Sequence, residues 1–194
     1  MLLSGNLWLF AALEQSLIMI IKKLAAPLVN DKLLQQAEHC YIATAEISEE
    51  GFDFIRSRIP TKTKMDLVTG MNGKTSLEVL QRIWKNYQGR INLNFYTRNV
   101  LHANVYVFDL PYRKSVAFIG SGACTLGGLK DQEEIFYKIT DPKEIESVMS
   151  WFTSYFEFSE PLTEKFIEEY EQLINKNRAP LSEERDSGDL NKKD

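Results

Sequence analysis

The chain has 194 residues, enough for one domain with terminal segments, and its 44% hydrophobic and 11% aromatic content can bury a sizeable core. The net charge is −4, but residues 160–194 hold ten acidic and six basic side chains, so residues 1–159 carry 17 of each sign. A body without net charge does not by itself indicate nucleic-acid binding, and a local basic rim is the alternative that stays open. Cys40 and Cys124 are too few and too far apart for a disulfide framework or a zinc site, which indicates a reducing, cytoplasmic location.

The first segment, residues 1–29, is strongly apolar, but Glu14-Gln15 interrupts it and the remaining runs are too short to span a bilayer. The basic pair Lys22-Lys23 follows the apolar run, which argues against a secretory signal. We expect a helix that packs in the core or against a second copy, and we expect Pro27 to end it. The alternatives are a membrane-surface segment and an extension upstream of a start at Met19.

Residues 30–177 alternate short apolar strands with amphipathic helices, the pattern of a single α/β domain. The expected strands are 40–47, 64–69, 91–97, 102–109, 115–120 and 134–139. The expected helices are 32–39, a helix opened by Ser48 and stopped by Pro60, one opened by the capping box Thr75 to Glu78, one capped by Asp141, and a last one through 166–174. We therefore expect an α/β sandwich with a mixed sheet, followed by a disordered polar tail over residues 178–194.

Residues 101–138 carry the candidate site. Strand alternation places His102 and Asn104 on one face of a strand that ends at Asp109. The next strand runs into Gly120-Ser121 and a glycine-rich segment that is too small and flexible for regular structure. Glu134 opens a third strand. The sequence thus predicts that a histidine, an aspartate, a Ser-Gly turn and a carboxylate meet at one edge of the sheet.

This stretch resembles the phospholipase D superfamily, whose signature is His-x-Lys-x4-Asp, then Gly-Ser-x-Asn, and further on a glutamate that opens a strand. The positions that match this signature and its spacing are His102, Asp109, Gly120, Ser121, Thr125, Gly128 and Glu134. Three positions depart from it: Asn104 replaces the lysine, Ala123 replaces the asparagine, and Gln132 replaces an asparagine common two residues before the glutamate. The resemblance implies a phospholipase D-like sandwich, with a mixed sheet flanked by helices.

The resemblance also implies the chemistry. One histidine attacks phosphorus, an opposite histidine protonates the leaving oxygen, and no metal or cofactor takes part. The implied catalytic residues are His102, Asp109 and Glu134, and the implied phosphate-binding residues are Asn104, Ser121, Thr125 and Lys130. Because the chain holds a single motif, the second histidine has to come from a homodimer. Substitutes for the missing lysine are available in Arg98, Arg113, Lys114 and Lys130.

Each of these residues also has an ordinary structural interpretation. His102 by itself is compatible with a structural strand histidine, and Asp109 with a turn cap. Glu134 is compatible with an exposed charge at a strand end, and Ser121 with a turn residue. Cys124 is expected to be a small filler and not a nucleophile.

The function expected from these features is a metal-independent nuclease, a hydrolase that cleaves phosphodiester bonds of DNA or RNA as a cytoplasmic homodimer without a membrane span. Slow turnover is expected because Asn104 removes a charged contact to phosphate and Ala123 removes a side-chain donor. The alternative is a catalytically degenerate relative that binds nucleic acid or serves as a subunit of a restriction or defence assembly.

Overall fold

The computed structural model describes residues 19–72 and 74–178, so the expectations for residues 1–18 and for the tail beyond 178 lie outside the described residues. A mixed sheet of eight strands forms the centre of the domain, in the order β1-β7-β6-β5-β2-β3-β4-β8. The strands are β1 (Met19–Ile21), β2 (His39–Thr44), β3 (Lys64–Gly70), β4 (Ile91–Tyr96), β5 (Asn104–Leu110), β6 (Lys114–Gly120), β7 (Phe136–Ile139) and β8 (Glu160–Pro161). β2, β3 and β4 are parallel, and the other neighbouring pairs are antiparallel. The expected α/β class with a mixed sheet is confirmed.

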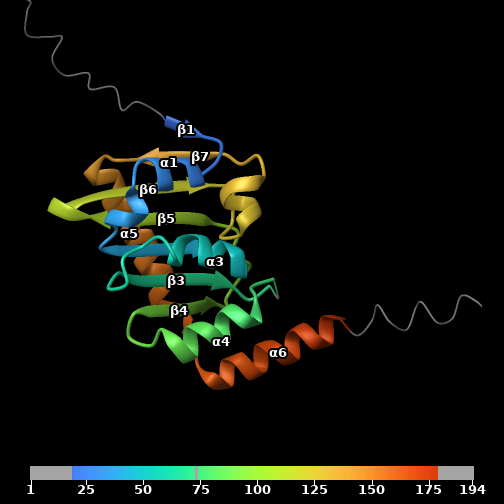
Figure 1. The fold of residues 1–194 in the computed structure, drawn as a ribbon. Coiled ribbons are helices and arrows are strands. Elements are labelled where there is room, and N and C mark those ends of the chain that lie inside the picture. Colours follow the sequence, from blue (N-terminus) through green and yellow to red (C-terminus); the bar gives the residue numbers. More distant parts are fainter. Residues whose placement is uncertain (1–18, 73, 179–194) are drawn as a thin grey trace, which may run out of the picture.

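Helices cover both faces of this sheet. The first face carries α1 (Ala25–Asn30), α2 (Leu33–Gln36), α3 (Glu49–Arg56), α4 (Leu77–Asn86) and α6 (Glu164–Arg178). The second face carries α5 (Pro142–Glu157). Two short helical turns, η1 (Pro111–Arg113) and η2 (Gly127–Asp131), complete the described elements. Figure 1 shows α3 and α4 in front of the strands and α5 behind them. None of the described helices is long and apolar enough to cross a membrane.

Two hydrophobic cores result, one on each face. β5 shows how the alternation divides them, because Tyr106 and Phe108 belong to the core under α3 and α4 whereas Val105 and Val107 belong to the core under α5. All four side chains are buried, as expected for a central strand covered on both faces.

The parallel strands define two edges of the sheet. β2, β3 and β4 end at Thr44, Gly70 and Tyr96, and we call this end the carboxyl edge. β5 is antiparallel to β2, so it starts at this edge with Asn104, and β6 ends here with Gly120 opposite Asn104. Figure 1 shows the arrowheads of β3 and β4 and the segment between β6 and β7 at the same side of the molecule. The opposite end of the strands is the amino edge.

Two local predictions were wrong. Pro27 does not end a helix but occupies the first turn of α1, where the backbone N–H that proline lacks would have no intrahelical partner. Residues 19–21 preceding it form strand β1 and not part of a helix. The N-cap of α4 is Ser76, whose hydroxyl accepts from the N–H of Val79. Thr75 is buried instead and bonds to Thr69.

A polar cluster holds the amino edge together on the α5 face. The ring of His39 stacks on Tyr41 with 4.2 Å between centroids, and its Nε2 lies 2.8 Å from a carboxylate oxygen of Asp66. The amide of Asn92 donates to the other oxygen of Asp66 at 2.7 Å. Burial alone would raise the pKa of Asp66, but the hydrogen bonds from His39 and Asn92 and the nearby charges of His39 and Lys64 lower it overall.

This cluster predicts how the stability of the fold falls at acid pH. Because the pKa of Asp66 is lower in the folded than in the unfolded chain, its contribution is present at neutral pH and is lost as the pH falls through about 4 and below. The urea midpoint of the native protein should therefore drop more steeply between about pH 5 and pH 3 than that of Asp66→Asn. Asn92→Ala removes one of the two hydrogen bonds and should give an intermediate slope. Equal slopes in all three proteins would contradict this account.

Candidate functional site

Asn104 ties three chain segments together at the carboxyl edge. Its Oδ1 accepts from the Thr44 hydroxyl at 2.9 Å and from the N–H of Ala45 at 3.2 Å, and its Nδ2 donates to the Ser121 carbonyl at 2.8 Å. The side chain is buried, with 5% of the residue exposed. Asn104 therefore does not lie open to solvent as a phosphate ligand would, and its position differs from the sequence expectation because a neutral amide can be buried once its groups are paired.

Thr44 completes this junction and was missed by sequence reasoning. Its hydroxyl also accepts from the N–H of Cys124 at 2.9 Å, so the end of β2, the start of β5 and the glycine-rich segment share one buried network. We call the contacts of Thr44 and Asn104 the Thr44–Asn104 junction. A threonine at the end of an apolar strand matches no motif, so nothing in the sequence pattern indicates its role.

Ser121 and Glu134 form a hydrogen-bonded pair next to the junction. The Ser121 hydroxyl donates to the Glu134 carboxylate and accepts from the N–H of Ile135 at 3.1 Å. Because the Ser121 carbonyl is held by Asn104, the structure joins Asn104, Ser121 and Glu134 in one chain of hydrogen bonds. This part of the predicted convergence is present at the carboxyl edge.

His102 is exposed and lies two residues before the first residue of β5. Within the described parts of the chain, no hydrogen bond or ion pair holds its ring, and the Glu134 carboxylate accepts from Ser121 and does not contact His102 through a hydrogen bond. The chain's other histidine, His39, is engaged with Asp66 at the amino edge. His102 is thus the histidine whose ring is open to a substrate.

Asp109 does not join this group. It lies at the opposite end of the seven-residue strand β5 from Asn104, a separation of roughly 15–20 Å. There its carboxylate accepts from the Tyr41 hydroxyl at 3.2 Å and from the Ser115 hydroxyl at 2.8 Å, which fastens β2, β5 and β6 to one another. The predicted meeting of Asp109 with the Ser-Gly turn is therefore not seen, because Gly120 at the end of β6 pairs with Asn104, whereas Asp109 pairs with Ser115 at the other end of the two strands.

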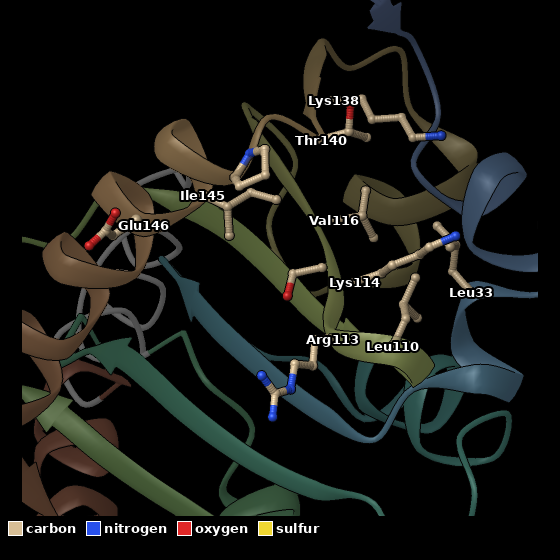
Figure 2. Close-up of a pocket in the computed structure, with 11 residues that line it drawn as sticks. Leu33, Leu110, Arg113, Lys114, Val116, Lys138, Thr140, Ile145 and Glu146 are labelled. Atoms are coloured by element: carbon tan, nitrogen blue, oxygen red, sulfur yellow. The ribbon is translucent and has the colours of Figure 1, made fainter.

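The largest described cavity also lies away from His102. It has a volume of about 630 Å³ and lies between the start of α5, the end of β7 and the hairpin that joins β5 to β6. Figure 2 shows Arg113 and Lys114 of that hairpin beside it, with Ile145 of α5 across from them. Ser115, the partner of Asp109, belongs to its lining, which places this cavity at the amino edge.

The remaining predicted residues have other surroundings. The Thr125 hydroxyl accepts from the N–H of Gly128 at 2.9 Å and so supports the start of η2. Lys130 is exposed on η2 and borders a hollow formed with α1 and α3. Arg98 lies on the same loop as His102, and its guanidinium sits 4.4 Å from the centre of the Phe158 ring. Arg98 is therefore the one of the four candidate cations that shares a loop with His102.

The glycines of the turn are required for close backbone approach. A Cβ on Gly120 would lie 2.1 Å from the carbonyl oxygen of Ile135, and one on Gly122 would lie 2.2 Å from that of Gly128. The segment is also more regular than predicted, because Gly127–Asp131 form a π-helical turn. These glycines allow tight packing instead of supplying flexibility.

Cys124 is buried within this segment and is not suited to nucleophilic attack. Burial raises the pKa of its thiol to about 12, so the reactive thiolate is scarce near neutral pH. No group of three or more histidine, cysteine or acidic side chains that could hold a metal ion occurs among residues 19–72 and 74–178.

The comparisons with known proteins point to one family. The family model described as the NgoFVII restriction endonuclease N-terminal PLD domain matches residues 22–171. No curated protein matches the sequence significantly.

Solved structures of this fold are similar at low identity. Nuc from Salmonella typhimurium, a phospholipase D family member, has a TM-score of 0.55 at 13% identity, with 74% of this chain and 96% of that chain covered. NucT from Helicobacter pylori has a TM-score of 0.53 at 14% identity, with 73% and 95% covered. Phosphatidylserine synthase from Haemophilus influenzae has a TM-score of 0.54 at 14% identity, with 86% of this chain but only 44% of that chain covered. At these identities the likeness shows the fold alone, and it confirms the predicted phospholipase D-like sandwich.

The junction predicts a stability effect that a solvent-facing ligand would not have. Asn104→Ala should lower the free energy of unfolding by roughly 2–4 kcal/mol, because it removes the side-chain partner of the Ala45 N–H and of the Ser121 carbonyl and one of the partners of the Thr44 hydroxyl. The matched control Asn99→Ala, an exposed asparagine on the preceding loop, should change it by less than about 0.5 kcal/mol. Urea unfolding followed by circular dichroism measures both. Similar small changes in the two variants would show that the Asn104 amide contributes little.

Proposed function

The chain belongs to the family of the NgoFVII restriction endonuclease N-terminal phospholipase D domain, and from this membership we propose that it is a nuclease in which His102 attacks the phosphodiester bond of DNA or RNA. The observation that carries the proposal is the contrast between the two histidines. His39 is held by Asp66 and Tyr41, whereas His102 is exposed. His102 lies at the carboxyl edge, two residues before the start of β5.

The reaction would proceed in two displacements. A neutral His102 ring attacks phosphorus while the imidazolium of His102 in a second copy gives its proton to the departing oxygen, leaving a phosphohistidine. Water then attacks phosphorus, loses its proton to the second histidine and releases the phosphate product with His102 restored. The first step needs a nucleophilic imidazole and a protonated one, and the second step needs a basic imidazole beside the phosphohistidine. A single chain with one exposed histidine does not supply such a pair.

The neighbouring residues would act at different distances from the reacting atoms. The Ser121 hydroxyl would serve as a phosphate donor by turning its proton from Glu134, its acceptor in this structure, to the substrate, with Glu134 as the positioning residue. Asp109 would act indirectly, by holding β2, β5 and β6 in register. Thr125 would support η2, and Lys130 would be a peripheral cation.

The first functional prediction separates the histidines. Cleavage of single- and double-stranded DNA and RNA should persist in EDTA, because the nucleophile and the proton donor are both imidazoles. His102→Ala should abolish the cleavage, while the control His39→Gln should retain it in correctly folded protein. Loss of activity in EDTA that magnesium restores would contradict the proposed chemistry, and equal activity of the His102 variant would contradict the assignment of the nucleophile.

A homodimer is the second requirement, and exposed apolar groups beside Ser121 support it. Ile135 is 57% exposed although its N–H is bonded to Ser121, and Ile119 on the neighbouring strand is 39% exposed. Uncovered aliphatic side chains next to a catalytic group are expected at an isologous contact. We therefore place the two-fold axis beside the turn that contains Ser121.

Disrupting this contact should separate the subunits. Ile135→Glu should convert the dimer to a monomer in analytical ultracentrifugation and reduce cleavage at least tenfold, because buried charge at a contact is costly. The control Val29→Glu alters an exposed aliphatic residue on α1 and should leave both properties unchanged. A native protein that is monomeric yet active would refute the shared site.

A second candidate function is favoured by the Thr44–Asn104 junction. Where the signature has lysine, Asn104 is buried and bonded to protein groups, and Ala123 offers no side-chain donor, so two groups that would stabilise the phosphate are absent. These losses favour a degenerate relative that binds nucleic acid within a restriction or defence assembly. Single-turnover assays with excess protein decide the matter: bound but uncleaved substrate supports this function, and cleavage that requires His102 supports the nuclease.

A further inference from the structure

A small cavity opens at the loop between β4 and β5, the loop that also carries His102. Its volume is about 300 Å³, at the lower end of the range of roughly 300–1,000 Å³ for small-molecule pockets, so it holds a fragment of a substrate and not a strand. Val100 and Leu101, which directly precede His102, form part of its lining, and Tyr96 at the end of β4 forms another part.

The residues that line the cavity suit a planar, neutral ligand group better than a phosphate. None of the described residues that line the cavity is charged, whereas a phosphate site would present cations or several converging N–H groups. Tyr96 offers an aromatic ring, and its position is fixed by Tyr155, whose ring centre lies 4.9 Å away. Aromatic and apolar surfaces of this kind hold nucleobases by stacking.

Two features show that the cavity lacks a partner within the described chain. Met71 and Val100 line it, yet 37% and 66% of their surfaces are exposed. Asn99 also lines it and is exposed, and among the described residues no hydrogen bond engages its amide. An amide with a free donor and a free acceptor matches the hydrogen-bonding edge of a base.

We propose that this cavity is a nucleobase subsite, in which Asn99 reads the base adjacent to the phosphate that His102 attacks. The proposal deepens the proposed function and rests on it for the substrate, but the binding of a base can be tested alone. A base reaches the cavity only when it is unpaired, so the substrate would be single-stranded or locally unstacked. Arg98, on the same loop, is placed to contact the backbone of that substrate.

The first test measures binding without catalysis. Ligand-observed NMR on the full-length protein would use the free nucleosides of the four bases as probes, with ribose 5-phosphate as the comparison. Nucleosides should bind with at least about a fivefold preference between the best and the worst base, and ribose 5-phosphate should not compete. Binding of ribose 5-phosphate as tight as that of the nucleosides would overturn the proposal.

Variants then assign the binding to the cavity. Asn99→Ala should remove the base preference and Val100→Asp should weaken nucleoside binding at least about fivefold. The matched control is Asn86→Ala. Asn86 is an exposed asparagine at the end of α4. It precedes β4 along the chain and therefore lies at the amino edge. This variant should bind as the native protein does. If Val100→Asp dissociates the dimer and leaves nucleoside binding intact, this surface is a subunit contact and the proposal fails.

The second test uses cleavage of short single-stranded homopolymers of each base. The native ratio of kcat/KM between the best and worst homopolymer should fall toward one in Asn99→Ala and stay unchanged in Asn86→Ala. Cleavage without base preference, together with no nucleoside binding, would refute the subsite and leave the nuclease intact. Nucleoside binding without any cleavage would refute the nuclease and leave the subsite intact.

Discussion

The buried amide of Asn104 is the contact on which the arrangement of the carboxyl edge depends. A carboxamide accepts and donates at once, so one side chain can hold the Thr44 hydroxyl and the Ser121 carbonyl together. Leaving such groups buried without partners costs about 1–3 kcal/mol each, which makes this meeting of segments specific. Ser121 then places Glu134, and β5 starts from a fixed point two residues after His102. The Thr44–Asn104 junction therefore positions the residues to which we assign the proposed chemistry.

The same amide shapes the electrostatics of any phosphate chemistry at this edge. A lysine in place of Asn104 could not accept from Thr44 or from the Ala45 N–H, so the observed junction and a charged group at this position exclude each other. Positive charge would have to come from another element. Arg113 and Lys114 lie beyond the opposite end of β5, too far to reach within one subunit, whereas Arg98 shares the loop of His102. Arg98 is therefore the cation that geometry favours.

The sequence predicts most elements of the fold because their periodicity is strong. The alternation over residues 102–109 correctly predicts strand β5, and the predicted convergence correctly brings Ser121 near Glu134. It misplaces Asp109, because the resemblance groups the residues of the motif at one site although the predicted strand itself puts Asp109 at the far end from His102. It also misses Thr44, whose importance comes from contacts with residues 60 and 80 positions away. Long-range polar contacts leave little trace in local patterns.

The proposed nucleophile and the proposed base subsite share the loop between β4 and β5, in which buried and exposed side chains alternate. Leu101 is 3% exposed and packs against Gly70 at the end of β3, so it fixes the loop to the core. Its neighbours Val100 and His102 are consequently exposed, one toward the small cavity and the other as the open imidazole. A single buried leucine thus holds both groups at a separation set by two peptide units. Any ligand group held against Val100 is thereby brought within one nucleotide of the histidine, which is the condition for reading a base at the point of cleavage.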